Sequence, residues 1–163
     1  MECCNFSMMD LSKLNWHDID YFHDIPEKVL FWIRDDQSLT FKLKRKYTDF
    51  RVQLIRQEEE DLFDHELDEL GKKDKFIVRE VFLYGNNEPV VFARSIIPNN
   101  EEMRPIIEIG EQPLGEVLFT HPAITREPIE VTFFNKIWGR RSFFSINGNR
   151  ILVCEFFLDK FEF

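Results

Sequence analysis

The sequence predicts an α+β fold, a single domain spanning residues 1–163 and built on an antiparallel sheet of about six strands. Several segments rich in β-branched and aromatic residues are joined by short turns that suit hairpins rather than long crossovers. The strands are apolar on both alternating sets of positions. We therefore expect short helices to cover at least one face of the sheet.

The first part of the chain is expected to hold two short helices. Residues 1–20 show little periodicity and are expected to form a partly ordered arm. Pro26 suits the first turn of a helix that carries the apolar positions up to residue 33. Ser38 can cap a second helix, which is basic and runs over 39–46.

The rest of the chain is expected to be mainly strands. Positive-φ residues at Asn86-Asn87 and at Asn147-Gly148 predict two hairpin turns of two residues each. Residues 58–70 are acidic and are expected to form a solvated loop or a short helix. Strands are predicted at 50–57, 75–84, 89–97, 125–137, 140–146 and 149–157, with a short helix at 113–119.

Composition limits the function classes. The 30 acidic and 21 basic residues give a net charge of −9, which argues against nucleic acid or an anionic membrane surface as the main partner. No run approaches the roughly 20 apolar residues of a membrane span. Cys3, Cys4 and Cys154 do not suggest a disulfide framework, and from the first residues we expect no signal peptide. We expect a cytoplasmic protein without stable membrane association, and a monomer because no heptad pattern is present.

Charged residues inside apolar strands are the best candidates for a site. Arg79 shares a strand face with apolar residues, and so does Glu155. Charged side chains are rarely buried unless they are paired or used. The four histidines are scattered without metal-ligand spacing, so we expect no metal.

Counting residues outward from each predicted turn gives these two residues cross-strand partners. With Asn86-Asn87 at the turn, Arg79 would lie opposite Arg94, an arrangement that suits an anionic ligand between two guanidinium groups. With Asn147-Gly148 at the turn, Glu155 would lie opposite Arg140. The alternative is purely structural: Arg140 and Glu155 form a salt bridge, and Arg79 or Arg94 pairs with Glu80 or a neighbouring acid.

Six motifs follow one another over roughly residues 76–158. They are Val78-Arg79-Glu80-Val81-Phe82-Leu83, Phe92-Ala93-Arg94-Ser95-Ile96-Ile97-Pro98, Gln112-Pro113-Leu114-Gly115-Glu116-Val117-Leu118-Phe119-Thr120, Thr125-Arg126-Glu127-Pro128-Ile129-Glu130, Trp138-Gly139-Arg140-Arg141-Ser142 and Glu155-Phe156-Phe157-Leu158. In their order and spacing the chain resembles the chorismate pyruvate-lyases, which split chorismate into 4-hydroxybenzoate and pyruvate.

The resemblance implies an antiparallel sheet whose helical flaps close over a buried ligand site, with no cofactor. Arg79 would hold the ring carboxylate, and Glu155 would lie near the C4 hydroxyl group. The backbone N–H groups of Leu114 and Leu39 would donate hydrogen bonds to the ligand. Arg94 or Arg140 would assist with the second carboxylate of the substrate.

The resemblance leaves the role of Glu155 open. It implies either a base that takes the hydrogen from C4 or a group that only orients the hydroxyl, in which case the hydrogen moves within the substrate. The product would supply ubiquinone synthesis.

Two other functions are compatible with the sequence. Ligand-binding domains of some transcription regulators resemble this lyase fold, so the chain could be a non-catalytic sensor of small aromatic acids. The chain could instead be an interaction protein that contacts its partner through the acidic residues 58–69. The matched Arg79 and Glu155 favour the enzyme.

Overall fold

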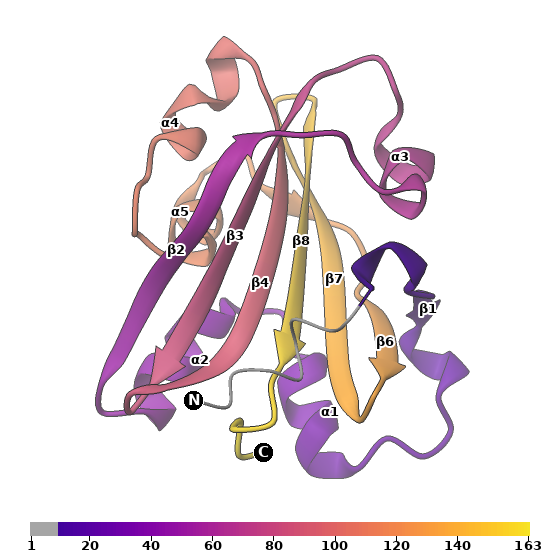
Figure 1. Cartoon of the computed structure of the whole chain (residues 1–163), viewed down its shortest axis with the longest axis vertical. Helices are drawn as coiled ribbons and strands as arrows, with labels where there is room; N and C mark the ends of the chain where they lie inside the picture. Colours follow the sequence, from indigo (N-terminus) through magenta and orange to yellow (C-terminus); the bar gives the residue numbers. More distant parts are fainter. Residues whose placement is uncertain (1–9) are drawn as a thin grey trace.

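The computed structural model describes residues 10–163 and confirms the α+β class with an antiparallel sheet. The sheet in this part of the chain has eight strands rather than about six, in the order β1-β6-β7-β8-β4-β3-β2, with β5 added beside β7 (Figure 1). The strands are β1 (His17–Asp18), β2 (Phe50–Glu59), β3 (Phe76–Gly85), β4 (Glu88–Pro98), β5 (Thr125–Arg126), β6 (Glu130–Phe134), β7 (Ile137–Ile146) and β8 (Asn149–Phe157).

Five short α-helices accompany the sheet within residues 10–163. They are α1 (Glu27–Ile33), α2 (Leu39–Lys46), α3 (Asp64–Leu70), α4 (Arg104–Ile107) and α5 (Leu114–Thr120). The basic helix over 39–46 was predicted with its observed bounds, and the acidic stretch contains the short helix α3.

Two additional strands explain the larger sheet. Residues 125–137, predicted as one strand, form β5 and β6 with an irregular segment between them that contains Pro128. Residues 135–136 form a positive-φ turn into β7. The short strand β1 pairs with β6 and lies within the segment that the sequence predicted as an arm. The first nine residues of that predicted arm lie outside the described residues.

The hairpin between β3 and β4 contains an irregularity that the sequence did not predict. Asn86 and Asn87 form the turn, with φ values of 51° and 68°. The register shifts between Leu83 and Tyr84, so that Val90 is an extra residue on β4. Farther along the hairpin the pairing is therefore displaced by one residue, which turns the side chains of β4 to the opposite faces from those expected.

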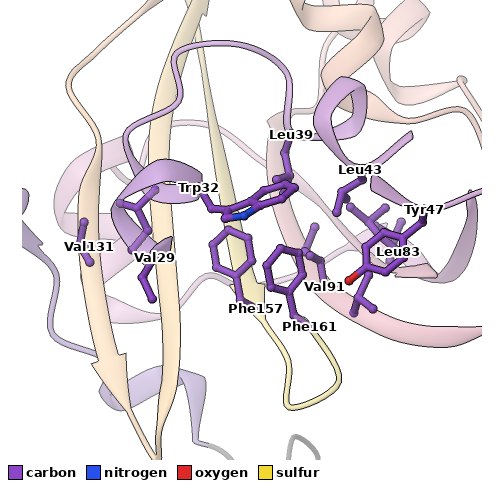
Figure 2. Packing of buried hydrophobic residues seen from close by; sticks show 14 residues of the cluster. Val29, Trp32, Leu39, Leu43, Tyr47, Leu83, Val91, Val131, Phe157 and Phe161 are labelled. Carbon is purple, nitrogen blue, oxygen red and sulfur yellow. The ribbon is translucent and has the colours of Figure 1, made fainter. Parts of the chain in front are cut away.

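Helices cover both faces of the sheet. On one face, α1 and α2 pack on β3, β4 and β8 around Trp32, Phe157 and Phe161, as Figure 2 shows. At the other end of the same face, α4 and α5 pack through a second cluster that contains Leu118 and Phe144. The opposite face is covered by α3 and the segment before β1. The space between the first two clusters is where a site can form.

The face beneath α3 carries a buried ion-pair network. Arg94 donates to both carboxylate oxygens of Glu66, at 2.7 and 3.0 Å, and to Glu80 at 2.8 Å. Arg56 donates to the same Glu80 at 2.7 and 3.2 Å. Burial opposes ionisation of Glu80, but the hydrogen bonds from Arg56 and Arg94 outweigh it and lower the pKa of this carboxyl.

The lowered pKa of Glu80 predicts an acid-sensitive contribution to stability. A depressed carboxyl pKa stabilises the fold above the unfolded value of about 4.3, and the contribution is lost as the pH falls through the folded pKa. We expect Glu80→Gln to lower the free energy of unfolding most at pH 7, and the gap from the unmodified protein to narrow as the pH falls below about 4. Urea unfolding of both proteins at several pH values measures this, and a constant gap would contradict it.

Candidate functional site

A small cavity lies between the two apolar clusters on the face covered by α1, α2, α4 and α5. All four residues predicted for the ligand site line it: Leu39, Arg79, Leu114 and Glu155. Its free volume is about 50 Å³, whereas ligand sites typically offer roughly 300–1,000 Å³. The helices over the cavity must therefore move, or side chains must shift, before an organic ligand can enter.

Arg79 forms one end of this cavity. Its Nη1 donates to the carbonyl oxygen of Gly110 at 2.7 Å and to Gln57 Oε1 at 3.0 Å, and its Nη2 donates to the carbonyl oxygen of Gln112 at 3.1 Å. No acidic side chain among residues 10–163 pairs with it, although the residue is only 2% exposed. Burial lowers the pKa of Arg79, but a guanidinium stays charged at neutral pH. The result is a fixed, unneutralised cation that faces the cavity.

Glu155 lies two strands away from Arg79, because β4 separates β3 from β8. Arg79 lies level with Ser95 and Val153, so Glu155 is also two residues farther along the sheet. Two strand spacings of about 4.8 Å and two rises of about 3.4 Å place the two backbones roughly 12 Å apart. The floor between them is formed by small or β-branched side chains, including Ala93 and Ser95 of β4 and Val153 of β8. This floor leaves room for a flat ring between a cation at one end and a carboxylate at the other.

Arg140 holds the carboxylate of Glu155. The predicted cross-strand pairing of Arg140 with Glu155 is confirmed, and Arg140 Nε donates to Glu155 Oε1 at 3.1 Å. Arg140 Nη1 donates to the carbonyl oxygens of Trp32 at 2.9 Å and Ile33 at 3.3 Å, at the end of α1. The ion pair therefore also ties the cavity wall to helix α1.

Leu39 and Leu114 occupy equivalent places in the two helices above the cavity. Each is the first residue of its helix, α2 or α5, so its N–H has no carbonyl partner one turn earlier in that helix. The two helix starts lie close together: a Cβ on Gly115 would come within 2.9 Å of Ser38 Oγ. An ion pair between Lys44 and Glu116 joins the same two helices.

Arg94 does not lie where the sequence predicted it. Arg94 was expected opposite Arg79, but Ser95 occupies that place, and Arg94 pairs with Glu80 across the sheet. The extra residue at Val90 is the reason, because it turns Arg94 to the face beneath α3. Arg94 therefore has no part in the cavity.

Arg126 lines the cavity and was not predicted as a site residue. It lies in the two-residue strand β5, and its Nε donates to Ser142 Oγ at 3.0 Å. In the sequence it stands between a threonine and a glutamate, a pattern typical of a solvent-exposed segment. The one signal in the sequence that could have indicated Arg126 is its place in the family motif at residues 125–130.

The family model for chorismate lyase matches residues 10–162 of the chain. The chain belongs to the chorismate lyase family. The match includes every residue that lines the cavity.

Curated relatives have the same family name. A probable chorismate pyruvate-lyase of Pseudoalteromonas atlantica is 35% identical, with 79% of this chain and 78% of the relative covered. The chorismate pyruvate-lyase of Pectobacterium atrosepticum is 32% identical, over 82% of this chain and 78% of the relative. That of Escherichia coli strain HS is 31% identical, over 85% and 88%.

Two features are absent from residues 10–163. No helix in this part of the chain is long and apolar enough to cross a membrane. No three or more His, Cys, Asp or Glu side chains in it are grouped so that they could hold a metal ion.

Proposed function

We propose that this chain cleaves chorismate into 4-hydroxybenzoate and pyruvate, and so supplies 4-hydroxybenzoate for ubiquinone synthesis. One observation carries the proposal. A buried arginine that no acidic side chain of residues 10–163 pairs with, and a fixed carboxylate, lie at opposite ends of one cavity in a chain of the chorismate lyase family. We further propose that it acts in the cytoplasm as a monomer.

In the proposed complex the ring lies on the floor formed by Ala93, Ser95 and Val153. The ring carboxylate accepts hydrogen bonds from Arg79, because a guanidinium fork matches a carboxylate in two-point contact. The C4 hydroxyl, at the opposite end of the ring, lies toward Glu155. The N–H groups of Leu39 and Leu114 donate to the ligand from above.

The reaction is an elimination and needs neither oxidant nor reductant. The hydrogen on C4 leaves as a proton, the electron pair of that bond completes the aromatic ring, and the C3–O bond breaks. The enolate of pyruvate departs and takes a proton at its methylene carbon. Because aromatisation is strongly favourable, binding and orientation in the cavity supply much of the acceleration.

The flaps over the site support this scheme. Helices α2 and α5 meet at Gly115 and Ser38, directly above the cavity. Opening them admits substrate, and closing them excludes water and fixes the ring. Product release through the same opening is then expected to limit turnover.

Mixing the purified protein with chorismate tests the proposal. We expect equal amounts of 4-hydroxybenzoate, followed by its absorbance, and pyruvate, followed by a coupled assay with lactate dehydrogenase. Chelator is included so that no metal contributes. Binding of 4-hydroxybenzoate without turnover would instead indicate a sensor or a trapped product, and a single-turnover experiment with enzyme in excess separates the two.

Replacing Glu155 by glutamine tests its role as the base. One carboxylate oxygen of Glu155 accepts from Arg140, and we assign the other to the C4 proton. We expect Glu155→Gln to lose roughly 100-fold or more in kcat, because glutamine cannot accept the proton. A loss well below this would mean that Glu155 only orients the hydroxyl.

An isotope experiment on the unmodified protein also distinguishes a base from a group that only orients the hydroxyl, and it does not depend on how a variant folds. The reaction is run in D₂O, and pyruvate is trapped at once as lactate. A base route places solvent deuterium in the methyl group. Transfer within the substrate would leave that group free of deuterium and would overturn the role of Glu155 as base.

A further inference from the structure

The charges that line the cavity are unbalanced. Its charged lining residues are Arg79, Arg126, Arg140 and Glu155. Only Arg140 has a carboxylate partner, Glu155, so the lining keeps two net positive charges. Chorismate carries two carboxylates, one on the ring and one on the enolpyruvyl group, and therefore has the complementary charge.

Among the described residues, the hydrogen-bond partners of Arg126 are neutral groups. Its Nε donates to Ser142 Oγ at 3.0 Å, and its Nη1 donates to the carbonyl oxygen of Asp35 at 3.3 Å. Its Nη2 makes no hydrogen bond within residues 10–163. The guanidinium lies 5.6 Å from the ring centre of Phe119 in α5 and 5.2 Å from that of Phe144, so it is fixed between flap and sheet.

Arg126 and Arg140 lie next to each other. Both donate from Nη1 to the same carbonyl oxygen, that of Asp35, at 3.3 and 3.2 Å. Burial and the neighbouring Arg140 cation both lower the pKa of Arg126, and the carboxylates of Glu155, Asp35 and Asp36 oppose this only in part. Two adjacent guanidinium groups, of which only Arg140 is paired with a carboxylate, make a place that the carboxylate of a ligand would stabilise.

The chemistry of the substrate decides which carboxylate this is. The ether oxygen stands on C3, next to C4, and C4 lies toward Glu155 in the proposed complex. The enolpyruvyl group therefore extends from the ring on the Glu155 side, away from Arg79. We propose that Arg126 binds the enolpyruvyl carboxylate of chorismate and so distinguishes substrate from product, which has lost that group.

This inference rests on the proposed function, and its test compares two ligands. Arg126→Met removes the charge and keeps much of the side-chain length. We expect the KM for chorismate to rise roughly 10- to 100-fold, the usual worth of a charge-assisted contact. The Kd of 4-hydroxybenzoate, measured by calorimetry, is expected to stay unchanged, because the product has no group for Arg126 to bind.

Two further variants keep the test decisive. Arg126→Lys retains the charge without the two-point fork, so it should also raise the KM and spare the Kd of the product, even if the methionine variant folds poorly. Arg150→Met removes a partly exposed arginine outside the cavity lining, paired with Glu127, and should leave both constants unchanged.

The outcomes separate the two proposals. Turnover of chorismate by the unmodified protein, with an unchanged KM in both Arg126 variants, would overturn only the role of Arg126. An equal loss of chorismate and product affinity would also overturn it, because Arg126 would then merely support the cavity. Neither turnover nor binding of chorismate by the unmodified protein would overturn the proposed function and this inference together.

Discussion

Arg79→Met is expected to lower kcat/KM for chorismate by roughly 100- to 1,000-fold, because the ring carboxylate then enters a buried site without its cation. Affinity for 4-hydroxybenzoate should fall as well, since the product keeps that carboxylate. Stability should change little. Arg79 is itself a buried cation whose partners are two carbonyl groups and one amide, so its removal ends a desolvation penalty while three acceptors lose a donor.

Steady-state kinetics, product calorimetry and urea unfolding measure these three effects. Arg51→Met is the matched control, because Arg51 is an exposed arginine on the adjacent strand β2, where it stacks on Tyr84. It should leave all three quantities unchanged. Unimpaired product affinity in Arg79→Met would show that the ring carboxylate is held elsewhere in the cavity.

Arg94→Met is expected to lower the free energy of unfolding by about 3–5 kcal/mol. Arg94 is next to Ser95, which lines the cavity, but its side chain lies on the other face of the sheet. Without this guanidinium, the buried carboxylates of Glu66 and Glu80 lose the hydrogen bonds of 2.7 to 3.0 Å that neutralise them. The helix cap that Glu66 provides at Phe63 N–H would also lose its support.

The ligand site should be spared in Arg94→Met, because the affected face is on the other side of the sheet. The Kd of 4-hydroxybenzoate, measured where the variant is fully folded, is expected to remain that of the unmodified protein. Arg150→Met, which breaks a partly exposed pair with Glu127, should cost less than about 1 kcal/mol. A comparable, small loss in Arg94→Met would contradict the importance of the buried network.

Most of the sheet could be predicted because its signals are local. Asn86-Asn87 and Asn147-Gly148 adopt positive φ at the expected turns, and each turn joins the two strands that the sequence predicts on either side of it. The extra residue at Val90 could not be predicted, because a bulge is decided by packing against strands on both sides of β4. That one residue is why the predicted pairing of Arg94 was wrong. The β7–β8 hairpin has no extra residue, and there the predicted pairing of Arg140 was right.

The site was predicted where a charge interrupts a strongly apolar strand, as at Arg79 and Glu155. Arg126 gives no such contrast, because β5 has two residues and is flanked by polar ones. Its position depends on pairing with β7, a contact between segments that only the folded sheet brings together. The resemblance to a family placed Leu39 and Leu114 in the prediction, since no pattern of side chains marks a backbone N–H.

The narrowness of the cavity has a consequence for the affinities that this protein can show. With about 50 Å³ free, the side chains and flaps of the protein already fill most of the space that a ligand needs. Every ligand must displace these side chains and flaps before it can make its own contacts with the cavity. A measured Kd is then weaker than those contacts alone would give, by the fraction of molecules that are open at any moment.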